Sequence, residues 1–144
     1  MKKYRRIKQI NQEDLYTTYQ VSKKYTDERH SFDYWKKKYK KTPELFVACY
    51  DDNRIIGICI GKIRKNKIIL SSIAVHIKFQ KQGIGKKLLK YFESKCKKIG
   101  KTIISVGSAK NVVKFYTKAG YKPVQKSKHF QKYILMEKKL NSVI

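Results

Sequence analysis

The sequence predicts a mixed α/β fold (α+β, with one mixed sheet). An antiparallel N-terminal meander joins a C-terminal half that reads strand, helix, strand, helix. Residues 45–75 hold runs rich in isoleucine and valine between short polar turns, which is typical of a meander. From Gln82 onward, apolar residues recur at spacings of three and four, which indicates an amphipathic helix. The 144 residues are 41% hydrophobic and contain no linker rich in Gly, Pro or Ser, so we expect a single domain over residues 1–144.

The first fifty residues predict one short strand and two helices. Weak alternation over residues 4–10 favours a first strand. Asn11 precedes two acidic residues and is the expected cap of a helix that extends to about Tyr25. Ser31 is the expected N-cap of a second helix, which the Thr42–Pro43 pair ends because a residue before proline avoids helical dihedrals.

The meander consists of three predicted strands, over residues 45–50, 55–63 and 68–75. The polar turn at residues 51–54 joins the first two strands as a hairpin. If that turn is symmetric, Cys49 lies opposite the residue at position 56, and Cys59 points to the other face of the sheet.

The C-terminal half alternates strands and helices. The helix that follows Gln82 should end at Gly100, because glycine readily adopts the left-handed conformation after a helix. Residues 102–106 form a short apolar strand, and a second helix should end at Gly120. Strands near residue 121 and over residues 133–140 complete the chain.

The charge predicts an anionic ligand and excludes several classes of protein. Lys and Arg total 36 against 10 acidic residues, which gives a formal net charge of +26 that would repel itself without anions nearby. Lysine dominates this charge, whereas nucleic-acid readers favour arginine, so we expect no specific nucleic-acid partner. Apolar runs are far shorter than the roughly 20 residues that span a bilayer, so we also expect no membrane partner.

The cysteines and histidines favour a reducing compartment without a metal centre. The three cysteines are an odd number and lack Cys-x-x-Cys spacing, which argues against a disulfide framework or a zinc site. His30, His76 and His129 are too separated to suggest a metal site. We therefore expect a cytoplasmic protein that binds no metal.

The segment between residues 73 and 87 carries the clearest functional signal. A strand runs into a polar loop, Gln80-Lys81-Gln82-Gly83-Ile84-Gly85-Lys86, and a long helix follows. The first amides of a helix have no partner within the helix and the helix dipole is positive there, so they bind anions. The two glycines leave room for a phosphate to approach. The pattern lacks the spacing of a Walker loop and the third glycine of a dinucleotide fingerprint.

Two motifs in this half resemble those of the GNAT acyl-CoA-dependent N-acyltransferases. The strand Ile-Ala-Val followed by Gln80-x-x-Gly83-x-Gly85 resembles the acetyl-CoA motif of the family. About 25 residues later, the segment from Asn111 to Tyr121, which contains Phe115-Tyr116 and Lys118-Ala119-Gly120, is similar to the second family motif. The resemblance implies a GNAT-like fold and transfer of acetyl from acetyl-CoA to a primary amine by direct attack.

The resemblance also implies roles for individual residues. The pyrophosphate of acetyl-CoA would bind at Gln80, Lys81, Gln82, Gly83, Ile84, Gly85 and Lys86. Ile73 and Val75 would offer main-chain groups to the pantetheine arm, and Asn111 would contact the cofactor. Tyr116 would be the catalytic acid that protonates the departing thiolate, because a phenol still holds its proton at neutral pH.

The sequence departs from the family at the general base. Many members carry a glutamate about six residues before the valine of the Ile-Ala-Val strand, where this chain has Ile69, and no carboxylate occurs between Asn53 and Gly83. The alternatives for proton removal are an ordered water, Ser71 or Ser72, His76, or a carboxylate from the front of the fold. Glu28 and Glu44 are the candidates of that last kind.

Two alternatives stay open at this point. The protein could be a basic module that binds CoA or RNA without turnover, which the missing glutamate and the charge would favour. The amine acceptor could be a small molecule, a protein amine or an amine on RNA. Its pocket would come from residues 16–44, where the aromatic residues Tyr25, Phe32, Tyr34 and Trp35 and the acidic residues Asp27, Glu28 and Asp33 either bind a cationic amine or pack. The sequence does not specify an oligomeric state.

Overall fold

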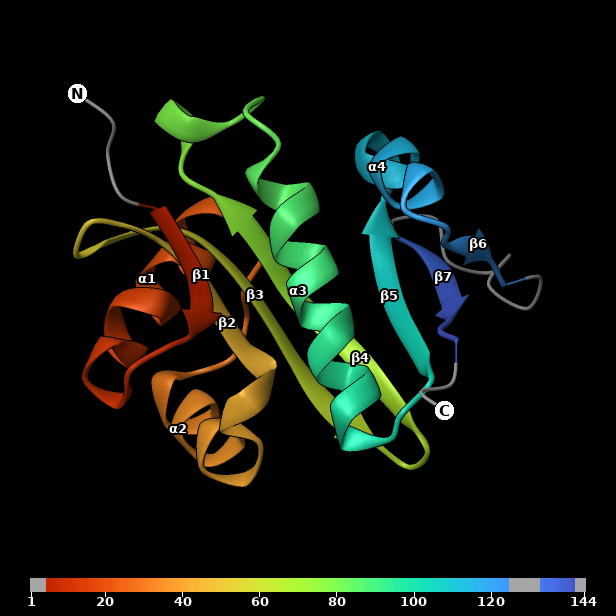
Figure 1. Ribbon diagram of the computed structural model, residues 1–144, viewed down its shortest axis with the longest axis horizontal. Coiled ribbons are helices and arrows are strands. Elements are labelled where there is room, and N and C mark those ends of the chain that lie inside the picture. Colours follow the sequence, from red (N-terminus) through yellow and green to blue (C-terminus); the bar gives the residue numbers. More distant parts are fainter. Residues whose placement is uncertain (1–4, 125–132, 142–144) are drawn as a thin grey trace.

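The computed structural model describes residues 5–124 and 133–141, which form a mixed sheet with helices on both faces (Figure 1). The seven-stranded sheet has the order β1-β2-β3-β4-β5-β7-β6. The strands are β1 (Arg5–Gln9), β2 (Phe46–Asp51), β3 (Arg54–Arg64), β4 (Lys67–Val75), β5 (Ile103–Ala109), β6 (Lys122–Pro123) and β7 (Tyr133–Lys139). The helices are α1 (Leu15–Tyr25), α2 (Phe32–Lys41), α3 (Ile84–Ile99) and α4 (Val113–Lys118). The predicted fold class is therefore confirmed.

The start of α1 differs from the prediction, whereas the start of α2 agrees with it. The Ser31 hydroxyl accepts a hydrogen bond from the Tyr34 amide at 3.2 Å and so caps α2. The Asn11 side chain caps no amide, because a 3-10 turn (Gln12–Asp14) separates it from α1. Asn11 Nδ2 instead donates to the carboxylate of Asp14 at 3.4 Å.

The predicted hairpin forms, but its register differs from the expected one. Tyr50 pairs with Ile55 as a symmetric turn requires, and a bulge then shifts the register by one residue. Cys49 therefore lies opposite Gly57, and the prediction that it faces residue 56 is wrong. The shift also places Cys49 and Cys59 on the same face, where both are buried in one core.

Two apolar cores cover the two faces of the sheet. The core beneath α3 includes Leu88, Phe92 and Cys96, and the core beneath α1 and α2 includes Tyr19 and Trp35. Alternate residues of β2 and β3 enter one core or the other, which explains why residues 46–50 of β2 and 55–61 of β3 are apolar without interruption. None of the helices in the described ranges has the length and apolar character of a membrane span.

Two glycines of β3 allow α3 to lie close to the sheet. A Cβ on Gly57 would come within 2.9 Å of Leu88 Cδ1, and a Cβ on Gly61 would overlap the Phe92 ring. Both helix residues are fully buried, so neither side chain has space to move away. The position of α3 over β3 therefore depends on the absence of side chains at these two strand positions.

The sheet opens into a V between β4 and β5. These parallel strands pair only at Ile68 with Ile104 and at Ile69 with Ser105, although β4 has nine residues and β5 has seven. Figure 1 shows the two strands diverging toward the end where α3 begins and α4 follows β5. This V, defined as the gap between residues 70–75 of β4 and residues 106–109 of β5, leaves one edge of β4 without a neighbouring strand in the described part of the chain.

The glycine contacts predict that Gly61→Ala destabilises the protein by about 1–3 kcal/mol, because an added methyl group must displace a buried ring. The matched control is Gly107→Ala, where the nearest atom would lie at an ordinary 3.8 Å. We expect the control to stay within about 0.5 kcal/mol of the wild type. Urea unfolding of both variants tests the prediction, and equal stabilities would contradict the packing argument.

Candidate active site

A polar cluster of Lys67, Ser105 and Glu137 joins the strands at the closed end of the V. Lys67 Nζ of β4 donates to the Glu137 carboxylate of β7 at 2.6 Å, and the Ser105 hydroxyl of β5 donates to the same oxygen at 2.8 Å. Three strands thus meet on one carboxylate beside the last paired residues of β4 and β5. The hydrogen bond from Lys67 is the main reason that the pKa of Glu137 lies below its ordinary value.

At the open end, main-chain groups of β4 face the gap. The His76 amide donates to the Ile56 carbonyl of β3 at 2.8 Å, so the alternation of a strand turns Ile73 and Val75 toward the opposite edge. Consistent with this, the Val75 carbonyl accepts a hydrogen bond from the Gln80 side chain at 2.9 Å, not from a strand. The residues that the structure describes place no strand beside Ile73 and Val75.

The loop from Gln80 to Lys86 ends at the start of α3, directly above this edge. Gly83 adopts φ +80° as the residue before the helix, and a side chain there would meet open space. No side chain within the described ranges caps the first amides of α3. Gly85 instead packs against α4, since a Cβ on it would lie 3.5 Å from the Phe115 ring. The first turn of α3 therefore has free amides at the open end of the V.

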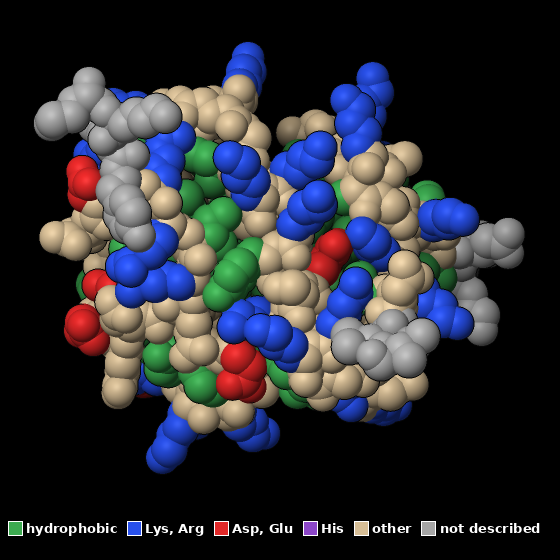
Figure 2. Space-filling view, in the orientation of Figure 1, with side chains coloured by type: hydrophobic (Ala, Val, Ile, Leu, Met, Phe, Trp, Pro, Cys, Tyr) green, Lys and Arg blue, Asp and Glu red, His purple; other side chains and the backbone are tan. Residues whose placement is uncertain are grey.

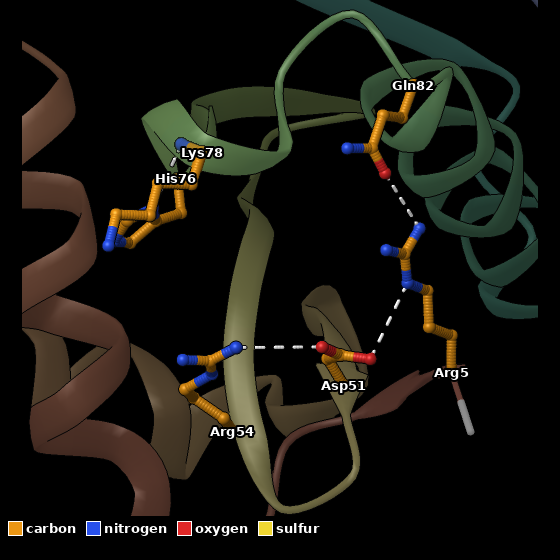
Figure 3. A network of polar contacts seen from close by, with 6 residues as sticks. All are labelled: Arg5, Asp51, Arg54, His76, Lys78 and Gln82. Atoms are coloured by element: carbon orange, nitrogen blue, oxygen red, sulfur yellow. Dashed lines mark hydrogen bonds and ion pairs between the residues drawn. The ribbon is translucent and has the colours of Figure 1, made fainter. Parts of the chain in front are cut away.

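Arginine contacts that the sequence did not suggest hold this loop in place (Figure 3). Arg5 Nη1 of β1 donates to the Gln82 side chain at 3.0 Å, and Arg5 and Arg54 both lie 3.6 Å from the Asp51 carboxylate. Asp51 is almost completely buried between them. The guanidinium groups also lie over the Phe79 ring, at 5.5 and 5.4 Å from its centre. Arg5 therefore connects Gln82 of the loop to Asp51 of the hairpin, and Phe79, just before the loop, packs against both arginines.

Basic side chains surround the loop. Figure 2 shows blue Lys and Arg side chains on both sides of a notch at the upper edge of the molecule, which is the open end of the V in the same view. The exposed lysines on the loop and on the first turns of α3 are Lys81, Lys86, Lys87 and Lys90. Lys110 and Lys114 are exposed on the opposite side, around the start of α4. Their charge adds to the positive end of the helix dipole at this notch.

The second motif lies on the other side of the V. Asn111 is exposed in a 3-10 turn (Lys110–Val112) between β5 and α4. Tyr116 of α4 is 4% exposed, and its ring packs against the rings of Phe115 and Tyr121 at 5.2 and 5.6 Å. In the described part of the chain its hydroxyl makes no hydrogen bond, whereas the Tyr121 hydroxyl donates to Glu93 at 2.8 Å.

The surroundings of Tyr116 keep its phenol protonated. Burial raises the pKa of Tyr116 well above its ordinary value, and the nearby Cys59 thiol raises it further. Cys59 pairs with Ile73 across β3 and β4. Cys59, Ile73 and Tyr116 belong to the same core on the α3 side of the sheet.

The candidate bases lie in different environments. Ile69 is half-buried at the closed end of the V, and the bulged residue Ser71 is exposed. Glu44 lies in a 3-10 turn (Pro43–Leu45) before β2. His76 Nδ1 accepts a hydrogen bond from the Lys78 amide at 3.2 Å, so this nitrogen is occupied within its own loop (Figure 3). Ser72, on β4, is buried.

Structure brings Ser72 and Glu28 together through a residue that sequence analysis missed. The Ser22 hydroxyl of α1 lies 2.8 Å from the Ser72 hydroxyl and donates to Glu28 Oε1 at 2.8 Å. The signal for Ser22 was available in the sequence. It follows Leu15 and Tyr19 at helical spacing, so it is a serine at a position where the helix buries its side chains.

Packing explains part of the aromatic group at residues 25–35. Trp35 is 4% exposed and contacts the rings of Tyr19 and Phe46 at 5.4 and 5.8 Å, so it belongs to the core. Tyr34 stacks on His30 with 3.8 Å between ring centres. His129 lies outside the described residues, and within those residues no three His, Cys, Asp or Glu side chains cluster as metal ligands.

Comparisons with known proteins point to one family. A family model described as an acetyltransferase (GNAT) domain matches residues 8–140, and no curated protein sequence matches significantly. Ard1 from Thermoplasma volcanium has a TM-score of 0.83 at 16% identity, covering 96% of this chain and 99% of that one. The PaiA N-acetyltransferase of Thermoplasma acidophilum in complex with coenzyme A has a TM-score of 0.71 at 23% identity, with 94% and 99% covered.

A third similar structure is the ribosomal-protein-S18-alanine N-acetyltransferase of Escherichia coli. Its TM-score is 0.74 at 16% identity, and the match covers 98% of this chain and 96% of that one. At these identities the structures establish a shared fold, and the family model extends over nearly the whole chain.

The cluster at the closed end predicts a specific dependence of stability on pH. The folded pKa of Glu137 lies below the unfolded value of about 4.3, so its ionised form stabilises the fold above that pH. This contribution is lost as pH falls through the folded pKa. We expect Glu137→Gln to be less stable than the wild type by up to about 1 kcal/mol at neutral pH, because both partners are partly exposed.

The difference between the two proteins should disappear in acid, and urea unfolding at a series of pH values measures it. The control is Glu13→Gln, which removes the same charge from an exposed residue. A difference for Glu137→Gln that persists unchanged in acid would contradict the assignment.

Proposed function

Because this chain belongs to the GNAT acetyltransferase family, we propose that its open V is the acetyl-CoA site and that the amine is acetylated there. The protein is an acetyl-CoA-dependent acyltransferase that transfers an acetyl group to an amine. The observation that supports the site best is the meeting, at one end of the V, of free helix amides and an unpaired strand edge. A basic module of the same fold without turnover is not favoured, because the family match is to an acetyltransferase.

The loop residues Gln80–Lys86 suit the pyrophosphate. Free amides of the first turn of α3 donate to phosphate oxygens, and the positive helix end and the surrounding lysines stabilise the negative charge. Gly83 leaves the approach open, and Arg5 holds Gln82 away from it. Asn111, exposed on the opposite side of the notch, contacts the cofactor in this proposal.

The unpaired edge of β4 suits the pantetheine arm. Its amide groups can pair with the main-chain groups of Ile73 and Val75 as an added strand would. In this proposal the thioester lies beside Ile73, which shares a core with Tyr116. A β4 amide near Val75 then stabilises the negative oxygen that forms when the amine attacks.

Tyr116 is the proposed general acid. Burial raises its pKa, so the phenol holds its proton at neutral pH, and no described partner accepts that proton. When the tetrahedral intermediate collapses, the C–S bond breaks and the departing thiolate receives the proton from the Tyr116 hydroxyl. The nitrogen of the new amide loses its extra proton to water, and the Tyr116 phenolate regains a proton from water.

The amine could be a small molecule or a protein amine, and its class is testable. Acetyl-CoA, with a panel of polyamines, amino acids and short peptides with free N-termini, should release free thiol only when an accepted amine is present. The single domain over residues 1–144 and the cytoplasmic location stay predictions from the sequence.

The pyrophosphate assignment predicts that Gly83→Glu abolishes acetyl-CoA binding, because the new carboxylate occupies the anion position. Gly100→Glu is a matched control at the other end of α3, since Gly100 also has a positive φ and open space around it. Both variants should lose about 1–2 kcal/mol of stability from the left-handed backbone. Calorimetric titration with acetyl-CoA should detect binding only to the control, and equal affinities would reject this site.

The acid assignment predicts that Tyr116→Phe lowers turnover about 10² to 10⁴ fold and leaves acetyl-CoA affinity and stability nearly unchanged. Tyr121→Phe should show the opposite pattern. It breaks the hydrogen bond to Glu93 and loses roughly 1 kcal/mol of stability, whereas turnover persists. Thiol release and melting temperature measured on both variants separate the two roles. Wild-type turnover in Tyr116→Phe would remove this residue from the mechanism.

A further inference from the structure

We propose that Glu28 takes up the proton that the acceptor amine loses, through a chain of the Ser72 and Ser22 hydroxyls. The inference rests on the proposed function and adds its missing base. An alkyl amine is mostly protonated near neutral pH and can attack the thioester only after it loses that proton. Ile69 has no group that could accept it, and β4 carries no carboxylate.

The chain of hydroxyls connects β4 to the loop after α1. Ser72 Oγ lies 2.8 Å from Ser22 Oγ, and Ser22 Oγ lies 2.8 Å from Glu28 Oε1. Ser72 and Ser22 are buried, whereas Glu28 is half-buried. Ser72 directly precedes Ile73, whose main chain faces the V, and the Ser72 hydroxyl lies on the α1 face of the sheet. The chain therefore begins one residue from the proposed pantetheine site and ends at the half-buried Glu28.

Counting protons fixes the direction of the hydrogen bonds. An ionised carboxylate only accepts, so the single proton of the Ser22 hydroxyl points to Glu28. The contact between Ser22 and Ser72 then requires Ser72 to donate. The Thr26 hydroxyl does not interfere, because its proton is donated to the Ser22 carbonyl at 2.7 Å. Every donor in the chain therefore points toward Glu28, and the lone pairs of Ser72 are left to accept a proton from the amine.

The environment of Glu28 suits a group that receives and releases a proton. Its second oxygen accepts the His30 amide at 3.1 Å, which fixes the carboxylate while it is ionised. Charged and titratable neighbours on the same loop are Asp27, Arg29 and His30, and Tyr133 of β7 donates to Asp27 at 2.7 Å. Arg29 and Asp27 pair with each other at 3.3 Å. Glu28 thus has no cation bonded to it among the described residues.

The transfer is balanced without another reactant. The N–H bond of the ammonium breaks as Ser72 gains a proton, Ser72 passes its own proton to Ser22, and Ser22 passes its own to Glu28. The neutral amine attacks, and Glu28 later releases its proton to water. Each serine ends as a neutral hydroxyl, so neither must form an alkoxide. Glu28 and Ser22 act through Ser72 and are positioning residues in this scheme.

The test uses the full-length chain with two nucleophiles at neutral pH. The first is the fastest alkyl amine of the panel, which arrives protonated, and the second is hydroxylamine, which arrives neutral. Glu28→Gln and Ser22→Ala should each lower kcat with the alkyl amine about 10² to 10⁴ fold. With hydroxylamine, each variant should stay within about threefold of the wild type, because no ammonium proton has to leave before attack.

Glu13→Gln, which removes an exposed carboxylate of the same type, is the matched control and should keep both rates. Melting temperature and acetyl-CoA affinity show whether each variant is folded. Equal losses with both nucleophiles, or an unchanged rate with the alkyl amine, would overturn the role of Glu28. A wild-type protein that binds acetyl-CoA but acetylates no amine would instead overturn the proposed function, and the relay with it.

Discussion

The structure depends on how little β4 and β5 pair. If these strands paired along their whole length, their main-chain groups would satisfy one another and leave nothing for a ligand. Two paired positions and the shared carboxylate of Glu137 hold the closed end, and beyond Ile69 no strand of the described residues pairs with this edge of β4. Within the sheet, this unpaired backbone lies at the end of the V near which the loop, α3 and α4 meet. The proposed acetyl-CoA site therefore depends on the incomplete pairing of β4 and β5.

The start of α3 must lie above that incomplete sheet, and two sets of contacts place it there. Along the helix, Gly57 and Gly61 of β3 let Leu88 and Phe92 approach the strand directly. At its N-terminal end, Arg5 joins Gln82 to Asp51 of the hairpin. These contacts come from β1 and the meander, outside the acetyl-CoA motif. In the proposed site Gly83 leaves room for a phosphate, and residues of β1, β2 and β3 fix the position of the loop and of α3.

Local patterns predicted the elements, whereas contacts between elements could not be predicted from them. Ser31 and Gly100 act at helix ends as expected, since caps depend on a few neighbouring residues. The bulge beside Cys49 depends on how two strands settle between two cores, so counting from the turn gave the wrong partner. The family resemblance supplied Tyr116 and the loop. It could not identify Ser22 as part of a proton path, because this chain has Ile69 where many family members have a glutamate. Only the structure shows that the Glu28 carboxylate is joined to Ser72 through Ser22.

The free edge of β4 also affects the rate at which amide protons exchange with solvent. Amides paired between β5 and β7 along all of β5 are protected by a continuous ladder, whereas amides of β4 that face the V have no cross-strand partner among the residues that the structure describes. A molecule that fills the gap and accepts hydrogen bonds from that edge slows exchange there and adds its binding energy to the stability of the surrounding sheet. Occupancy of the V can therefore be followed residue by residue along β4, independently of whether any acetyl group is transferred.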